Sequence, residues 1–226
     1  MLIGLDFGTS SAKVAVRSPY LGRGNVTAVT WPDGNGGRSF LLPTNLSEPT
    51  ASGRIAVETK PSPADRSLKV DLMERPDSVE ARTNAACYLA WVLRTSRCHV
   101  LSSLQEAYGI YFLRWSLNLG IPSAGYDDAE IKRGFRIAGA AAWALSVQKT
   151  PPTRSEAVAT VNRLSGTEFK PESLLDLNEI EVVPEIVAEA ARYARSHERR
   201  NGLHFPSRRR CFDYRLLRLR STRARR

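Results

Sequence analysis

The side chains best suited to chemistry stand close to the start of the chain. Asp6 ends a short apolar run, and Gly8-Thr9-Ser10-Ser11 follow it. Glycine has no Cβ, so the backbone at Gly8 can bend sharply and approach a ligand closely. Backbone N–H groups and hydroxyls gathered in one turn bind phosphate oxygens, and a neighbouring carboxylate suits hydrated Mg²⁺. The stretch predicts a phosphate site, although a simple hairpin turn capped by an aspartate would use the same residues.

The elements that must position this turn are strands. Apolar residues precede it in 2–5 and follow it in 14–16, which predicts a β-hairpin with Asp6 at its mouth. Further strands are expected over 26–31, 38–43, 55–57, 111–119 and 180–183. Helices are expected from a cap at Ser78 to about 96–99, over 129–147 behind Asp127 and Asp128, over 155–164, and from Pro184 to about 196. Strands alternating with helices predict an α/β fold with a mixed sheet and flanking helices.

Composition limits the class of protein. The chain has 226 residues, of which 42% are hydrophobic, as expected of a globular protein. It has no apolar run long enough to span a membrane and no signal-peptide pattern. Three cysteines, Cys87, Cys98 and Cys211, form an odd set without metal-ligand spacing. We therefore expect a cytoplasmic protein with free thiols and no membrane partner.

The basic charge is concentrated in one segment. The net charge is +10, and residues 199–226 hold 11 arginines and one acid, Asp213, so 11 − 1 = +10. The remainder of the chain is neutral. A nucleic-acid-binding domain is expected to show a basic patch, so we expect no nucleic-acid partner except through non-specific contacts with the arginine-rich tail.

Three later segments carry further motifs: Gly120-Ile121-Pro122-Ser123-Ala124 after a strand, the acidic Tyr126-Asp127-Asp128, and Arg133 to Ala138-Gly139 on a helix. They resemble a turn, an acidic linker and a helix of the seventy-kilodalton heat-shock chaperones, a branch of the actin-like ATPase superfamily whose first phosphate loop the opening turn also resembles. The segment 180–191, IEVVPEIVAEAA, resembles a strand and glutamate-bearing helix of the family, with Pro184 before the glutamate instead of after it. Lys69 stands where the family carries a catalytic lysine.

The resemblance implies a fold and a site. The fold is the first, ribonuclease-H-like lobe of an actin-like nucleotide-binding domain, over residues 1–200, with ATP and Mg²⁺ as ligands. The implied roles are water-mediated Mg²⁺ binding by Asp6, phosphate binding by Gly8, Thr9 and Ser10, charge stabilisation by Lys69, and positioning of metal-bound water by Glu185. Lys13 is a further candidate for phosphate contact. Protein clients and co-chaperones are partners of full-length relatives.

The family's second phosphate loop is not found. It should follow the glutamate helix by about twenty residues, but residues 201–226 hold no D-x-G motif and are rich in arginine. We expect this tail to be disordered or the product of a frameshift, and the chain to be a truncated lobe with impaired catalysis. The other interpretation of the tail is a basic arm for an acidic surface or RNA.

Other interpretations remain for the chain and its residues. The same lobe occurs in sugar and small-molecule kinases and in filament-forming actin relatives, and a non-enzymatic adaptor with a basic tail is a further alternative. Lys69 could be a surface lysine, and Glu185 a first-turn acid stabilised by the helix dipole. Asp127 and Asp128 are expected to be helix caps and not metal ligands.

Overall fold

The computed structural model describes residues 1–18, 26–33, 35–47, 50, 53–57, 67–109, 111–166 and 173–185. All of them belong to one compact unit, Met1–Glu189. The second unit, Ala190–Arg226, lies outside the described residues. So do the expected arginine-rich tail, most of the helix expected after Pro184, and the domain boundary expected at residue 200.

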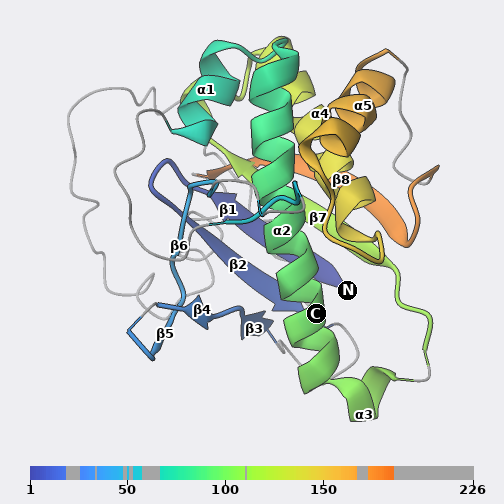
Figure 1. The fold of residues 1–226 in the computed structure, drawn as a ribbon. Helices are drawn as coiled ribbons and strands as arrows, with labels where there is room; N and C mark the ends of the chain where they lie inside the picture. The colour runs from blue at the N-terminus through green and yellow to red at the C-terminus, as the bar shows by residue number, and fades with distance from the viewer. Residues whose placement is uncertain are drawn as a thin grey trace, which may run out of the picture. The chain divides into compact units, whose positions relative to one another are not determined.

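A mixed sheet is the centre of the unit (Figure 1). Its strand order is β3-β2-β1-β7-β8, and β6 also pairs with β2. The opening hairpin of β1 and β2 is antiparallel, whereas β7 and β8 run parallel to β1. The strands are β1 (Leu2–Phe7), β2 (Ser11–Arg17), β3 (Val26–Ala28), β6 (Leu42–Pro43), β7 (Trp115–Ile121) and β8 (Leu177–Pro184). The predicted hairpin and mixed sheet are confirmed.

The described helices lie on one side of this sheet, with α3 beyond the end of α2 (Figure 1). They are α1 (Leu68–Glu74), α2 (Val79–Ser103), α3 (Gln105–Tyr108), α4 (Ala129–Ser146) and α5 (Arg154–Ser165). Alternate residues of a strand point to opposite faces, and Ile3, Leu5 and Phe7 of β1 are buried towards the helices. The ring of Phe7 stacks on Tyr88 of α2 and meets Phe135 of α4 edge-on.

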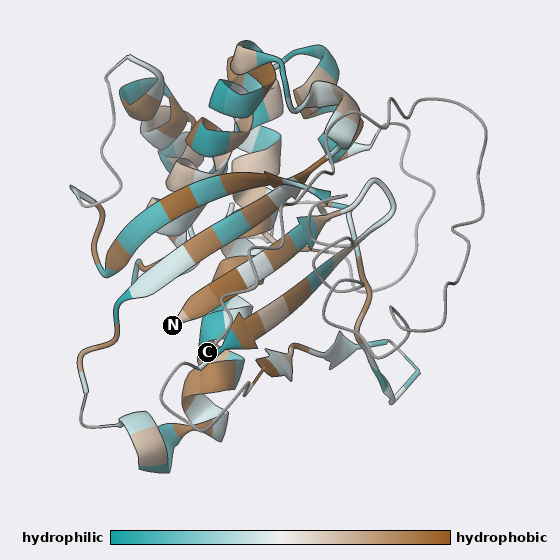
Figure 2. Ribbon diagram, turned by 180° about the vertical axis from the view of Figure 1, so that it is seen from behind, coloured by the Kyte–Doolittle hydropathy of each residue, from teal (hydrophilic) through white to brown (hydrophobic). Residues whose placement is uncertain are grey.

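The opposite face of the sheet is seen in Figure 2, where no described helix lies over β1, β2, β7 and β8. Its rows hold small and polar residues together with apolar ones such as Leu2 and Val183. Asp6 is paired across β1 and β2 with Lys13 and across β1 and β7 with Gly120. These three positions therefore share one row on the face that points away from α2 and α4.

Two predicted helix starts are confirmed by their caps. The Ser78 hydroxyl accepts a hydrogen bond from the backbone N–H of Ala81 at the start of α2. The Asp128 carboxylate accepts from the N–H groups of Glu130 and Ile131, at 2.8 and 3.1 Å. Each bond satisfies a donor that the first helical turn leaves unpaired.

The strands expected over 26–31 and 38–43 are each broken in two. Beyond β3 the chain turns away, and β4 (Trp31–Pro32) pairs with β5 (Arg38–Ser39) in a separate small sheet. The Asp33 carboxylate closes their turn by accepting from the N–H groups of Asn35 and Gly37. Phe40 and Leu41 then lie exposed before the chain returns to β2 as β6.

Three more strand boundaries were predicted incorrectly. β7 begins at Trp115, not at 111, because its partner β1 begins at Leu2, opposite Ser116. β8 is longer than expected and ends at Pro184, and Glu185, the next residue, is already helical. The 55–57 segment forms only an isolated bridge between Val57 and Leu46.

None of the helices among the described residues is long and apolar enough to cross a membrane.

The two cysteines in the described residues are expected to differ in reactivity. Cys98 is exposed, whereas burial raises the pKa of the Cys87 thiol to about 11. Because the thiolate is the reactive form, Cys98 should react with a thiol reagent within minutes at pH 8, and Cys87 only after unfolding. The labelling rates are compared in a Cys211→Ser variant, in which Cys87 and Cys98 are the two remaining thiols. Labelling of native Cys87 at a rate within about tenfold of the Cys98 rate would contradict the buried position.

Candidate functional site

The candidate site lies at one edge of the sheet, where the parallel strands β1, β7 and β8 end. Asp6 is next to the last residue of β1, Gly120 occupies the same level in β7, and Glu185 directly follows β8. Carboxyl ends of neighbouring parallel strands meet at one edge, which is where open α/β sheets bind ligands. The fold thus brings together two carboxylates that are far apart in the sequence.

Gly120 keeps the space between these carboxylates free of a side chain. A Cβ built at Gly120 would lie 3.6 Å from Cγ of Glu185 and 3.7 Å from Cα of Asp6. Glycine inside a strand often marks such a close approach. A longer side chain at this position would project between Asp6 and Glu185.

Lys69 is the third charged residue of the site. It lies in the first turn of α1 and is only 2% exposed. Its Nζ forms an ion pair with Oε1 of Glu185. A buried ammonium needs a partner to offset its lost hydration, and Glu185 is that partner for Lys69. The prediction of a surface lysine is excluded by this burial.

The start of α1 rests on the Gly8–Ser10 turn. Ser67 occupies the N-cap position, but its hydroxyl makes no cap hydrogen bond within α1. It donates instead to the backbone oxygen of Thr9, at 2.9 Å. This bond joins the helix that carries Lys69 to the turn that follows Asp6, so the two segments are held at a fixed distance.

Gly8 is required by the shape of the turn. A Cβ at this position would lie 2.2 Å from the backbone oxygen of Ser11, far inside van der Waals contact. The buried Thr44 holds the turn from the other side, because its hydroxyl donates to the oxygen of Gly8 and its N–H to the oxygen of Ser10. Thr9 and Ser10 themselves are exposed.

Lys13 also lies at the site, on the strand opposite Asp6. Its Nζ is 3.5 Å from Oδ2 of Asp6, and both side chains are largely exposed, at 58% and 42%. An exposed ion pair of this kind contributes little to stability. Both groups can therefore exchange this contact for a ligand at small cost.

The predicted site residues Asp6, Gly8, Thr9, Ser10, Lys13, Lys69 and Glu185 thus lie along one edge of the sheet and its adjoining turn. Three supporting residues of the site, Ser67, Thr44 and Gly120, were not predicted from the sequence. Only Gly120 carried a signal, as a glycine within an apolar strand. Asp128 is a helix cap, as expected.

The donors at this edge suit a hydrated cation combined with phosphate oxygens. No group of three or more His, Cys, Asp or Glu side chains within the described ranges could enclose a metal ion. Mg²⁺ usually takes one or two carboxylates and fills its remaining positions with water and phosphate. Asp6 and Glu185 fit that requirement, whereas a zinc site would need more protein ligands.

The chain was compared with known proteins. No family model matches it, and neither a curated protein nor a solved structure does.

Gly120 offers a test of the space at this edge. Gly120→Ala adds only ordinary contacts and should leave ligand binding unchanged. Gly120→Leu should weaken binding at least about tenfold, because the side chain would displace a ligand from between the two carboxylates. Titration calorimetry with Mg-ATP, beside a thermal melt of each variant, checks this. Equal affinities for the alanine and leucine variants, both folded, would show that no ligand lies there.

Proposed function

We propose that this chain is a nucleotide-binding lobe that holds the phosphates of ATP with Mg²⁺ at the Asp6–Lys69–Glu185 edge. The observation that carries the proposal is the meeting of a buried lysine and two carboxylates beside a tight hydroxyl-rich turn. Phosphoryl-transfer sites work mainly by positioning and by stabilising charge. The two lysines and two carboxylates of the site carry no net charge together. The site therefore favours phosphate only when a cation such as Mg²⁺ binds with it.

Each residue has a specific role in this proposal. The carboxylate of Asp6 holds Mg²⁺ through water, and the hydroxyls of Thr9 and Ser10 donate to phosphate oxygens. Lys69 exchanges part of its contact with Glu185 for a phosphate oxygen, which leaves the Glu185 carboxylate able to orient a water molecule. Bound Mg²⁺ would neutralise phosphate charge. Lys13 supplies a second, exposed cation beside Asp6.

Within this class we infer a heat-shock-chaperone-like lobe on the ribonuclease-H-like actin fold, working in the cytoplasm. The support is the sequence similarity of the opening loop, the Gly120–Ala124 turn and the Glu185 segment, together with a mixed sheet in which those segments end at one edge. The described residues supply one side of a phosphate site, so the proposal concerns binding and not turnover.

Calorimetry on matched variants tests the proposal. The parent chain should bind ATP saturably with Mg²⁺ and bind AMP much more weakly, since AMP lacks the β- and γ-phosphates. Asp6→Asn keeps the side-chain shape and should weaken Mg-ATP binding about tenfold, the usual value of one charge-assisted contact. Glu106→Gln removes the same charge from an exposed residue of α3, at the opposite end of the unit from α1 (Figure 1), and is the control. Unchanged affinity in Asp6→Asn would refute the proposal.

A further inference from the structure

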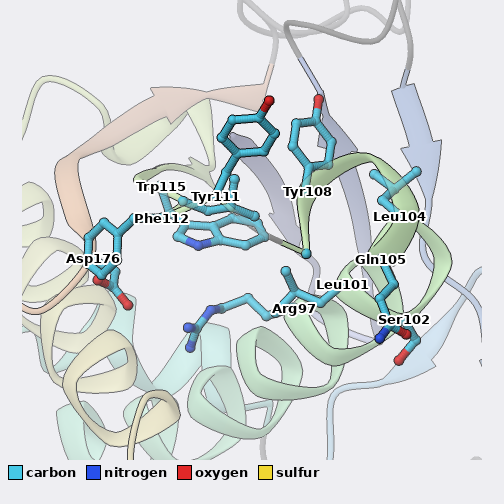
Figure 3. Close-up of a pocket in the computed structure, with 12 residues that line it drawn as sticks. Arg97, Leu101, Ser102, Leu104, Gln105, Tyr108, Tyr111, Phe112, Trp115 and Asp176 are labelled. Atoms are coloured by element: carbon cyan, nitrogen blue, oxygen red, sulfur yellow. The ribbon is translucent and has the colours of Figure 1, made fainter.

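A cavity of about 470 Å³ lies at the other end of β7, near the start of that strand. Figure 3 shows its lining. The last turns of α2, the short helix α3 and the segment before β7 form most of the wall, and Asp176 closes it from the residue before β8. Its volume is in the range of small-molecule sites. Its lining shares no residue with the phosphate edge.

Arg97 is the cation of this cavity. Its guanidinium carbon lies 5.6 Å from the ring centre of Trp115 and 5.1 Å from that of Trp143. The aromatic faces fix the guanidinium in place, but they accept none of its hydrogen bonds. Its Nε is buried without a partner. Burial lowers the pKa of Arg97, and the charge of Asp176 acts in the opposite direction.

Asp176 is the anion of the cavity, and its backbone is unusual. It is the only non-glycine residue in the described part of the chain with a positive φ, at 61°. Its main-chain oxygen accepts from the N–H of Trp115 at 2.8 Å, which fixes this conformation. The side-chain atom Oδ1 is buried and has no hydrogen-bond partner. Positive φ at a non-glycine residue is often found at functional sites.

The two charges do not neutralise each other directly. No ion pair within 4.0 Å joins Arg97 to Asp176, although each is within electrostatic range of the other. Figure 3 shows the guanidinium and the carboxylate on the same side of the cavity. Buried polar atoms without partners are costly, so a ligand with an anion for Arg97 and a cation for Asp176 would satisfy both.

The rest of the wall combines polar side chains, Ser102 and Gln105 among them, with exposed apolar ones. Leu101, Tyr111 and Phe112 line it and are 40%, 63% and 75% exposed. Large apolar side chains exposed together usually mark a binding surface. The hydroxyl of Tyr111 points away from the charged pair (Figure 3), so the ring offers mainly an apolar face to a ligand.

We propose that this cavity binds a free α-amino acid with an apolar side chain. Its carboxylate accepts hydrogen bonds from Arg97, its ammonium group donates to Asp176, and its side chain packs against Leu101, Tyr111 and Phe112. A free amino acid carries a carboxylate and an ammonium group on the same carbon, whereas either terminus of a peptide carries only one of these two charged groups. The proposal does not depend on nucleotide binding at the other edge of the sheet.

Titration calorimetry of the full chain with L-phenylalanine tests this. We expect saturable binding with a Kd on the order of 1 mM or tighter. L-phenylalaninamide lacks the carboxylate and N-acetyl-L-phenylalanine lacks the ammonium group, so each should bind at least about tenfold more weakly. Glycine, without an apolar side chain, should also bind weakly.

Variants assign the binding to the charged pair. Asp176→Asn keeps a residue that tolerates positive φ and should reduce L-phenylalanine affinity about tenfold or more, as should Arg97→Gln. Asp127→Asn, the same change of charge at an exposed residue beyond the far end of β7 and outside the cavity lining, should bind as the parent does. If Arg97→Gln fails to fold, the affinity of Asp176→Asn for L-phenylalanine tests the proposal alone. Absence of saturable binding at 10 mM (roughly tenfold above the expected Kd), equal binding of the amide, or unchanged affinity in Asp176→Asn would overturn the proposal.

Discussion

Lys69→Met should lose Mg-ATP affinity by about a hundredfold, because it removes a buried cation that would contact phosphate. Stability should fall by less than about 1 kcal/mol, because methionine fills the space of the lysine stem and leaves no buried charge behind. Glu185, with a side chain 38% exposed, can then be hydrated. Calorimetric titration and urea denaturation measure the two effects separately.

Two further variants sharpen this result. Glu185→Ala leaves the Lys69 ammonium buried and unpaired, so it should cost about 2–3 kcal/mol, less than for a fully buried pair because Glu185 is partly solvated. Lys149→Met is the control, since Lys149 is exposed and distant from the site in sequence. A larger stability loss in Lys69→Met than in Glu185→Ala would mean that the lysine, and not its lost partner, supports the fold.

Gly8→Ala is the second substitution with a large expected effect. The new Cβ would lie 2.2 Å from the oxygen of Ser11, and the backbone there is fixed by the β1–β2 pairing and by Thr44. The turn must therefore move, at a cost of about 1–3 kcal/mol in unfolding free energy. Because Thr9 and Ser10 would move with it, Mg-ATP binding should weaken as well.

The matched control lies in the same hairpin. The nearest atom to a Cβ built at Gly4 would be the backbone oxygen of Ala15, at 3.8 Å. Gly4→Ala should therefore change the free energy of unfolding by less than about 0.5 kcal/mol, as for a substitution that meets no clash. Chemical denaturation compares the pair. Equal stability of Gly8→Ala and Gly4→Ala would contradict the turn geometry.

Elements with strong local signals were predictable from sequence. The β1–β2 hairpin is bounded by alternating apolar residues, and α2 and α4 begin at Ser78 and Asp128, which bond the first-turn N–H groups. The boundaries of β7 and β8 were not predictable from sequence, because pairing with a parallel neighbour determines where each strand begins and ends. β7 begins where β1 offers a partner, although the aromatic residues before Trp115 have strong strand propensity.

The site was predictable in part for a similar reason. Asp6 and its turn lie within one local motif, so residue types alone indicated phosphate binding. The partnership of Lys69 with Glu185 joins positions 116 residues apart and depends on the approach of α1 to the end of β8. The hydroxyl of Ser67 cannot be distinguished from an ordinary helix cap by sequence, yet it joins α1 to the turn.

The pairing of Lys69 also explains how a buried lysine can serve a ligand. In the structure its ammonium is paired with Glu185, whose Cγ lies close to Gly120, a position without a side chain. A phosphate entering there would replace a carboxylate oxygen with another oxyanion, so the lysine keeps a partner throughout. The cation is thus in place before the ligand arrives, which lowers the cost of ordering it.

Chemical labelling tests the central claim most directly. An acyl-phosphate derivative of ATP transfers its acyl group to a lysine close to the terminal phosphates, and mass spectrometry of the digested chain identifies that lysine. The proposed site predicts modification of Lys69, with Lys13 as the second position, and loss of both when excess Mg-ATP competes. Labelling confined to other lysines, or labelling of Lys69 that Mg-ATP does not suppress, would contradict a phosphate site at this edge of the sheet.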